Sequence, residues 1–120
     1  MYDNSNVFAR ILSGDIPAAK VYEDDTVLAF NDSSPSAPVH VIVVPKGEYS
    51  SFQHFTETAP VEAIGKFFQS VQRVAKHLGV DKNGFRLVTN NGADAGQTVF
   101  HFHVHILAGE PLGGVCGRRT

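Results

Sequence analysis

The stretch FHFHVHI, residues 100–106, constrains the fold of this 120-residue chain more than any other segment. It places His101, His103 and His105 at strict two-residue spacing. Because successive side chains of a β-strand point to opposite faces, this spacing predicts a strand with all three imidazoles on one face. The intervening apolar residues would take the other face: Phe102, Val104 and Ile106. We therefore expect a half-buried strand whose polar face carries only imidazole, the side chain that changes charge nearest neutral pH.

The composition is that of an ordinary globular domain, with 42% hydrophobic and 18% charged residues. We expect one domain over residues 1–120, with a short C-terminal tail at about 109–120. No apolar run approaches the roughly 20 residues that span a bilayer, so we expect no membrane partner. The first ten residues, MYDNSNVFAR, do not resemble a secretory signal, and a single cysteine, Cys116, suits the cytoplasm.

The net charge of −2 gives no electrostatic reason to expect a nucleic-acid partner. The ten lysines and arginines are spread along the chain, without a stripe that alternates with aromatic residues. The Arg118-Arg119 pair is most simply part of a solvated tail.

The hydrophobic pattern predicts five strands and two helices. The strands are expected at 19–24, 26–32, 39–45, 85–90 and through the histidine segment, and the helices at 7–13 and about 58–78. Residues 39–45, VHVIVVP, are apolar almost throughout, which indicates a central strand covered on both faces. An order that does not alternate strictly between strand and helix favours an α+β fold with a mostly antiparallel sheet.

The longer helix should start near a threonine cap, Thr56 or Thr58, with Pro60 in its first turn and Gly79 at its end. Steps of three and four residues predict one buried stripe: Val61, Ile64, Phe68, Val71, Ala75 and Leu78.

Clustered histidines raise the possibility of a metal site, but the spacing disfavours it. At about 3.3 Å per residue, His101 and His105 would lie roughly 13 Å apart on a straight strand. Zinc requires each ligand nitrogen at about 2.0–2.1 Å. The chain has no CxxC or HExxH to complete a site. We expect no metal and no other cofactor, although a metal-binding protein stays open as an alternative.

Nucleophilic catalysis at phosphorus fits the pattern better. A neutral imidazole is a good nucleophile when an acceptor holds its second nitrogen, and neighbouring histidines can supply hydrogen bonds or protons. Directly upstream, Gly96 allows backbone N–H groups to approach an anion, and Gln97 and Thr98 add neutral donors. Taken alone, this segment is equally consistent with a hairpin turn.

Other polar residues are weaker candidates. His40 could orient a catalytic imidazole on the next strand, although a lone histidine there is usually a core residue. Asp32 could accept hydrogen bonds from ribose, or simply initiate a turn. His54 and His77 are interpreted as structural, His77 being well placed for the dipole of the longer helix.

Taken together, AGQTVF followed by HFHVHI resembles the motif of the histidine triad family. IPAAKVYEDD (16–25), LAFND (28–32), SPSAPVHVIVVPK (34–46) and the segment 90–108 are similar to its nucleotide-binding Hint branch, so the resemblance covers nearly the whole chain. It implies five antiparallel strands with two helices, in a homodimer whose sheets join into one ten-stranded sheet. It also implies binding of purine nucleoside monophosphates, and hydrolysis of adenosine phosphoramidates and aminoacyl adenylates.

The resemblance further implies roles for individual residues. His103 would be nucleotidylated, His101 and His40 would orient it, and His105 would contact the phosphate region or hold the backbone geometry. The resemblance also implies a phosphate site and a ribose and purine pocket: Asn90, Gly96, Gln97 and Thr98 for phosphate, Asp32 for ribose, and Val7, Phe8, Ile11 and Phe30 as purine walls.

Three departures from the family pattern bear on specificity. Some bacterial members carry an N-terminal CxxC that joins two histidines in a structural zinc site, whereas residues 4–9 here are Asn-Ser-Asn-Val-Phe-Ala. Ser33 replaces an apolar wall residue, which could loosen purine preference. The tail lacks the tryptophan of some relatives.

Two functional alternatives stay open: a dinucleoside polyphosphate hydrolase of the Fhit type, and a nucleotide- or partner-binding dimer whose catalysis is incidental.

Overall fold

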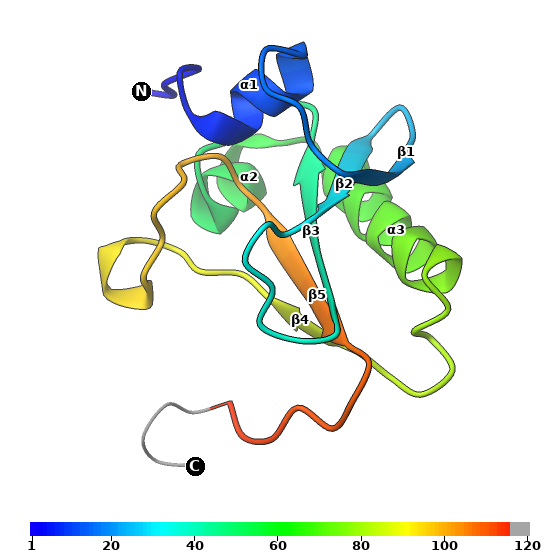
Figure 1. Ribbon diagram of the computed structural model, residues 1–120. Helices are drawn as coiled ribbons and strands as arrows, with labels where there is room; N and C mark the ends of the chain where they lie inside the picture. The colour runs from blue at the N-terminus through cyan, green and yellow to red at the C-terminus, as the bar shows by residue number, and fades with distance from the viewer. Residues whose placement is uncertain (116–120) are drawn as a thin grey trace.

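Five strands form one antiparallel sheet in the order β1-β2-β3-β5-β4 (Figure 1). The computed structural model describes residues 1–115, so Cys116 and the Arg118-Arg119 pair lie outside the described residues. The elements in chain order are α1 (Val7–Ser13), β1 (Lys20–Glu23), β2 (Val27–Asn31), β3 (Val39–Pro45), α2 (Phe52–Thr58), α3 (Val61–His77), β4 (Arg86–Val88), a 3-10 turn (Ala93–Ala95) and β5 (Val104–Ala108). The predicted α+β class and antiparallel sheet are confirmed.

The sheet separates two layers of apolar packing. On one face, residues of β2, β3 and β5 pack with Phe55 of α2 and with Phe67 and Val71 of α3. On the other, Phe8 and Ile11 of α1 pack on the sheet. β3 lies in the middle of the sheet and is buried from His40 to Pro45, as its apolar sequence predicts.

The helices differ from the prediction in number and in the buried face. α1 matches the expected residues, but α2 was not expected, and it begins at a Ser51 cap. The predicted threonine cap of the longer helix is wrong. Thr56 and Thr58 lie in α2 and donate to the carbonyls of residues four positions earlier, and α3 begins after Pro60 without a side-chain cap.

The predicted stripe of α3 is correct in part: Val71 and Ala75 are buried, and Ile64 and Leu78 pack against the core. Val61 is 82% exposed and Phe68 38% exposed, whereas the buried residues are Phe67, Ser70, Val71, Val74 and Ala75. Both sets follow steps of three and four residues, so periodicity could not choose between adjacent rotations of the helix. The aromatic ring of Phe67, which packs edge-on against Phe55 and tilted against Phe102, determines which face of α3 is buried.

The histidine segment is only partly a strand. β5 begins at Val104, so the prediction that His101, His103 and His105 share one strand is wrong for the first two. The alternation nevertheless continues through the extended chain before β5. Phe102, Val104 and Ile106 all enter the core on the α2/α3 face of the sheet, as predicted. The imidazole side is also less open than expected, since His101 is 1% and His103 8% exposed.

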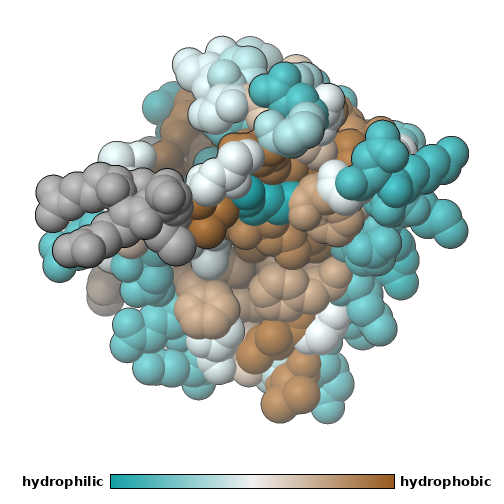
Figure 2. Space-filling view, turned by 90° about the horizontal axis from the view of Figure 1, so that it is seen from below, coloured by the Kyte–Doolittle hydropathy of each residue, from teal (hydrophilic) through white to brown (hydrophobic). Residues whose placement is uncertain are grey.

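Some large apolar side chains remain at the surface. Leu87 on the edge strand β4 is 44% exposed, and Phe100 is 49% exposed. Figure 2 shows one face of the molecule on which hydrophobic residues occupy the middle and hydrophilic residues the rim. Within residues 1–115, no helix has the length and apolarity to cross a membrane.

Candidate active site

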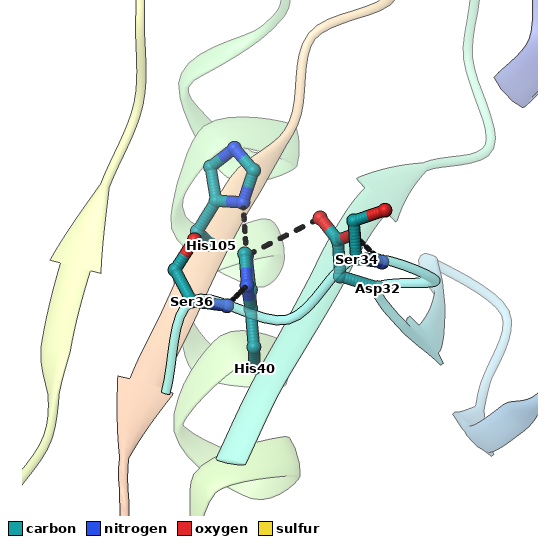
Figure 3. A network of polar contacts seen from close by, with 5 residues as sticks. All are labelled: Asp32, Ser34, Ser36, His40 and His105. Carbon is teal, nitrogen blue, oxygen red and sulfur yellow. Dashed lines mark hydrogen bonds and ion pairs between the residues drawn. The ribbon is translucent and has the colours of Figure 1, made fainter. Parts of the chain in front are cut away.

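His40 and His105 form a hydrogen-bonded pair on the α1 face of the sheet. β3 and β5 pair so that Ile42 lies opposite His105, which brings the His40 side chain diagonally across to it. His40 Nε2 lies 2.8 Å from His105 Nδ1 and 3.4 Å from Asp32 Oδ2. The backbone N–H of Ser36 donates to His40 Nδ1 at 3.0 Å. Figure 3 shows the loop after β2 wrapping around His40 to make these contacts.

These contacts fix where the protons lie. Because Ser36 N–H is a donor, His40 Nδ1 is the unprotonated nitrogen and Nε2 carries the proton. His40 therefore donates to His105 Nδ1, and in neutral His105 the proton is on Nε2. The pair thus presents an N–H donor from His105, with the Asp32 carboxylate beside His40.

His103 carries its proton on Nδ1, whereas His40 and His105 carry theirs on Nε2, and a nucleophilic Nε2 requires this tautomer. Its Nδ1 lies 2.8 Å from the carbonyl oxygen of His101, and since a carbonyl only accepts, Nδ1 carries the proton. The lone pair of neutral His103 is therefore on Nε2. The ring packs edge-on against Phe8 at 4.8 Å and against His105 at 5.1 Å, both measured between centroids.

His101 contributes its backbone to this arrangement rather than an exposed ring. Its Nε2 donates to the carbonyl of Pro45 at 2.9 Å, and its ring is almost completely buried. The side chain thereby anchors the extended segment against the end of β3. The contact of His101 with His103 is made through the backbone, since the His101 carbonyl accepts from His103 Nδ1.

Burial keeps the three triad histidines neutral. It lowers the pKa of His101 and of His103 below 6.5, even though each ring donates to a carbonyl that favours the protonated form. Burial, with repulsion from His103 and His40, lowers the pKa of His105 to about 4. At neutral pH the three triad imidazoles are therefore uncharged, the state in which Nε2 of His103 can attack.

A cavity of about 450 Å³ opens beside the histidines, between α1 and the edge of the sheet. This is within the size range of small-molecule sites. It is lined by all six residues predicted for the ribose and purine pocket: Val7, Phe8, Ile11, Phe30, Asp32 and Ser33. Phe8 connects the cavity to His103, and Asp32 connects it to His40. A second hollow, of about 500 Å³, lies near Gly109 and is lined by none of the residues predicted for the site.

Only some residues of the predicted phosphate-binding segment can offer a hydrogen-bond donor to a ligand. Gly96 has a φ of +83°, a conformation that favours glycine and closes the turn before Gln97. The Gln97 side chain is buried: its oxygen accepts from Gly92 N–H, and its amide donates to Ser50 O and Val99 O. The donor that we expected Gln97 to offer a phosphate is therefore engaged by backbone carbonyls, one before α2 and one in its own loop. Thr98 is exposed, and Asn90 is half-buried after β4.

Three residues near the histidines were not identified from the sequence. Ser36 acts through its backbone N–H, and Thr89 donates to the His103 carbonyl at 2.8 Å. The Tyr2 hydroxyl contacts His101 Nδ1. A backbone donor leaves no signal in the sequence, and Tyr2 is separated from His101 by 99 positions.

The geometry does not favour a metal at the histidine pair. Among residues 1–115, Asp32, His40 and His105 are the one group of potential ligands whose donor atoms lie within 4.8 Å of one another. A metal-bound histidine normally donates its second ring N–H to an acceptor. His40 instead accepts an N–H at Nδ1, so its proton occupies the nitrogen that would bind the metal.

Residues 4–9 of the N-terminal stretch include no cysteine or histidine. Asn6 accepts from Ala9 N–H and caps α1, and it provides no thiolate.

Comparison with known proteins places this geometry in a family. A family model described as the HIT domain matches residues 13–112. The chain belongs to the HIT domain family. An uncharacterized HIT-like protein of Rickettsia prowazekii is 47% identical over 115 residues, covering 96% of each chain. A 14 kDa zinc-binding protein of Brassica juncea is 39% identical and covers 88% of this chain and 94% of its own.

Solved structures of HIT proteins have the same fold. A HIT family hydrolase from Clostridium thermocellum superposes with a TM-score of 0.85 at 36% identity, covering 95% of this chain and 98% of its own. A histidine triad protein from Clostridium difficile gives 0.83 at 42% identity, covering 96% and 99%. The family assignment made from the histidine motif is confirmed, and it places the chain in a family that includes hydrolases.

Proposed function

We propose that this HIT protein hydrolyses purine nucleoside phosphoramidates and aminoacyl adenylates to the nucleoside monophosphate. The observation that carries the proposal is the protonation of the triad: His103 has its proton on Nδ1 and a free lone pair on Nε2, beside a nucleotide-sized cavity. This activity is the one that the resemblance to the Hint branch of the family implies.

The reaction would proceed in two displacements at phosphorus. In the first, His103 Nε2 forms a bond to the phosphorus, and the bond from phosphorus to the leaving nitrogen breaks with its electron pair. The leaving amine takes a proton from a water molecule, while the Nε2–H of neutral His105 can donate a hydrogen bond to the phosphate oxygens. In the second, water attacks the nucleotidylated His103, losing a proton, and the imidazole leaves with its electron pair.

The pocket accounts for the nucleoside part of the substrate. Phe8 and Phe30 meet edge-on at 5.5 Å and, with Ile11, provide an apolar wall suited to a purine ring. Asp32 lies at the polar end, where its carboxylate can accept from ribose hydroxyls while Oδ1 accepts from Ser34 N–H. Ser33 is the one polar side chain among the predicted wall residues.

We further propose that the functional unit is a homodimer in which two sheets join into one. β4 is an edge strand of three residues, and its exposed Leu87 supports this as the joining edge. A cytoplasmic location stays a prediction from the sequence.

The proposal is tested by following AMP release from an adenosine phosphoramidate carrying a lysine or fluorescent amine, in the presence of EDTA. His103→Asn should lose turnover, and the exposed His77→Asn, at the end of α3, should keep it. Turnover of a diadenosine polyphosphate in preference to the phosphoramidate would support a Fhit-type hydrolase. AMP binding without turnover of either substrate would support a nucleotide-binding role.

A further inference from the structure

The N-terminal segment before α1 reaches the first histidine of the triad. The Tyr2 hydroxyl lies at 2.5 Å from His101 Nδ1, and the two rings meet edge-on, with centroids 5.7 Å apart. Tyr2 is half-buried, and His101 is among the most completely buried side chains of the described chain. A residue at the start of the chain thus contacts the ring whose carbonyl orients His103.

The direction of this hydrogen bond follows from the partners of His101. Nε2 of His101 faces the carbonyl of Pro45 and therefore carries the proton, so Nδ1 of the neutral ring is an acceptor and Tyr2 is the donor. Burial raises the pKa of Tyr2, which keeps the phenol protonated and able to donate. Both nitrogens of His101 are consequently engaged, one by the N-terminal segment and one by the end of β3.

Asn6 holds the Tyr2 oxygen in place. Its side-chain amide donates to the Tyr2 hydroxyl at 3.0 Å and to the Asp3 carbonyl at 2.8 Å. Its side-chain oxygen accepts from Ala9 N–H and caps α1. The helix that supplies Phe8 to the cavity wall is therefore connected through Asn6 and Tyr2 to the histidine segment.

We propose that Tyr2 is a positioning residue for the reaction, which fixes the tautomer and placement of His101 and, through the His101 carbonyl, the free Nε2 of His103. This inference rests on the proposed function for its kinetic consequence. Its structural consequence, the tautomer of two histidines, holds whatever the substrate is. Three hydrogen bonds join Asn6 to Tyr2, Tyr2 to His101 and His101 to His103, and through them Tyr2 acts on the His103 ring.

The test is Tyr2→Phe, which keeps the ring against His101 and removes only the hydroxyl. Nitrogen NMR of the imidazoles in the ligand-free protein should show the His101 Nδ1 resonance shifting, and His103 sampling both tautomers. On the phosphoramidate, kcat should fall about threefold to tenfold, the range for one net hydrogen bond, with KM nearly unchanged.

Two further variants make the result specific. Tyr22→Phe is the matched control, since it removes a hydroxyl on β1 that donates to Asp24, directly after the strand. It should leave the resonances of both histidines and kcat unaltered. Asn6→Ser keeps an oxygen that can cap α1 but removes the amide donor, so it should shift the His101 resonance in the same direction by a smaller amount.

The outcomes separate the two proposals. Unchanged resonances of His101 and His103 in Tyr2→Phe would overturn the positioning role, as would an equal effect of Tyr22→Phe. An inactive wild-type protein would overturn the phosphoramidate hydrolase, while the NMR comparison would still decide the role of Tyr2.

Discussion

Replacing Phe102 should cost more stability than any other single change in the histidine segment. Phe102 is 1% exposed and stacks on Phe55 with centroids 4.9 Å apart and planes at 19°. It also contacts Phe67 at 5.1 Å. Truncating a buried phenylalanine to alanine typically costs about 3–5 kcal/mol, and aromatic contacts contribute about 0.5–1.5 kcal/mol beyond burial. We therefore expect Phe102→Ala to lower the free energy of unfolding by about 4 kcal/mol.

Urea denaturation followed by circular dichroism measures this loss, because the chain has no tryptophan for fluorescence. With a slope of about 2 kcal/mol per molar, the urea midpoint should fall by about 2 M. Phe100→Ala is the matched control, since Phe100 is 49% exposed and its truncation should cost about 0.5 kcal/mol or less. Similar losses for the two variants would refute the reasoning that Phe102 anchors the segment and thereby directs its histidines to the opposite face.

Four further predictions concern the site. Asp32→Ala should weaken a ribose-bearing nucleotide by about 1–3 kcal/mol but leave a dideoxy analogue almost unaffected, and calorimetry showing equal losses for both would remove Asp32 from the ribose site. Because burial lowers the pKa of His103, kcat/KM should stay high below pH 6.5, and an acid limb at or above 6.5 would contradict that protonation state. His105 in the folded protein, with a pKa of about 4, resists protonation that the unfolded chain accepts near 6.5, so the urea midpoint should fall as pH decreases from about 6.5 toward 4. His105→Asn should reduce that dependence. Gly96→Ala should strain the turn before Gln97, where φ is +83°, and a variant with unchanged stability and activity would show that the turn adapts.

The strands of the sheet could be predicted from the sequence because burial imposes a simple hydrophobic pattern on strands. The apolar run of β3 and the alternation around His103 each have one interpretation once a strand is assumed. α2 was missed because it is only seven residues long and buries a single side chain, Phe55, so it shows no periodicity. The stripe of α3 was displaced because a helix with apolar residues at 67, 68, 71, 74 and 75 supports more than one rotation.

For the site, the sequence identified which residues gather but not how they are protonated. The residues predicted for the base and ribose pocket line one cavity, since they lie on α1, on β2 and directly after it. The tautomers depend instead on long-range contacts, such as His101 with Pro45, and on backbone donors such as Ser36 N–H. Gln97 was expected to face a ligand because a glutamine after a glycine offers donors. Its burial within the loop is a tertiary effect that spacing does not reveal.

The most direct test of the account is to trap the covalent intermediate. Wild-type protein mixed with an adenosine phosphoramidate and quenched at alkaline pH, which preserves the bond from phosphorus to nitrogen, is digested and examined by mass spectrometry. We predict one adenylylated peptide, modified at Nε2 of His103, which disappears in His103→Asn. Adenylylation at another residue, or full turnover by His103→Asn, would contradict the assignment of His103 as the nucleophile.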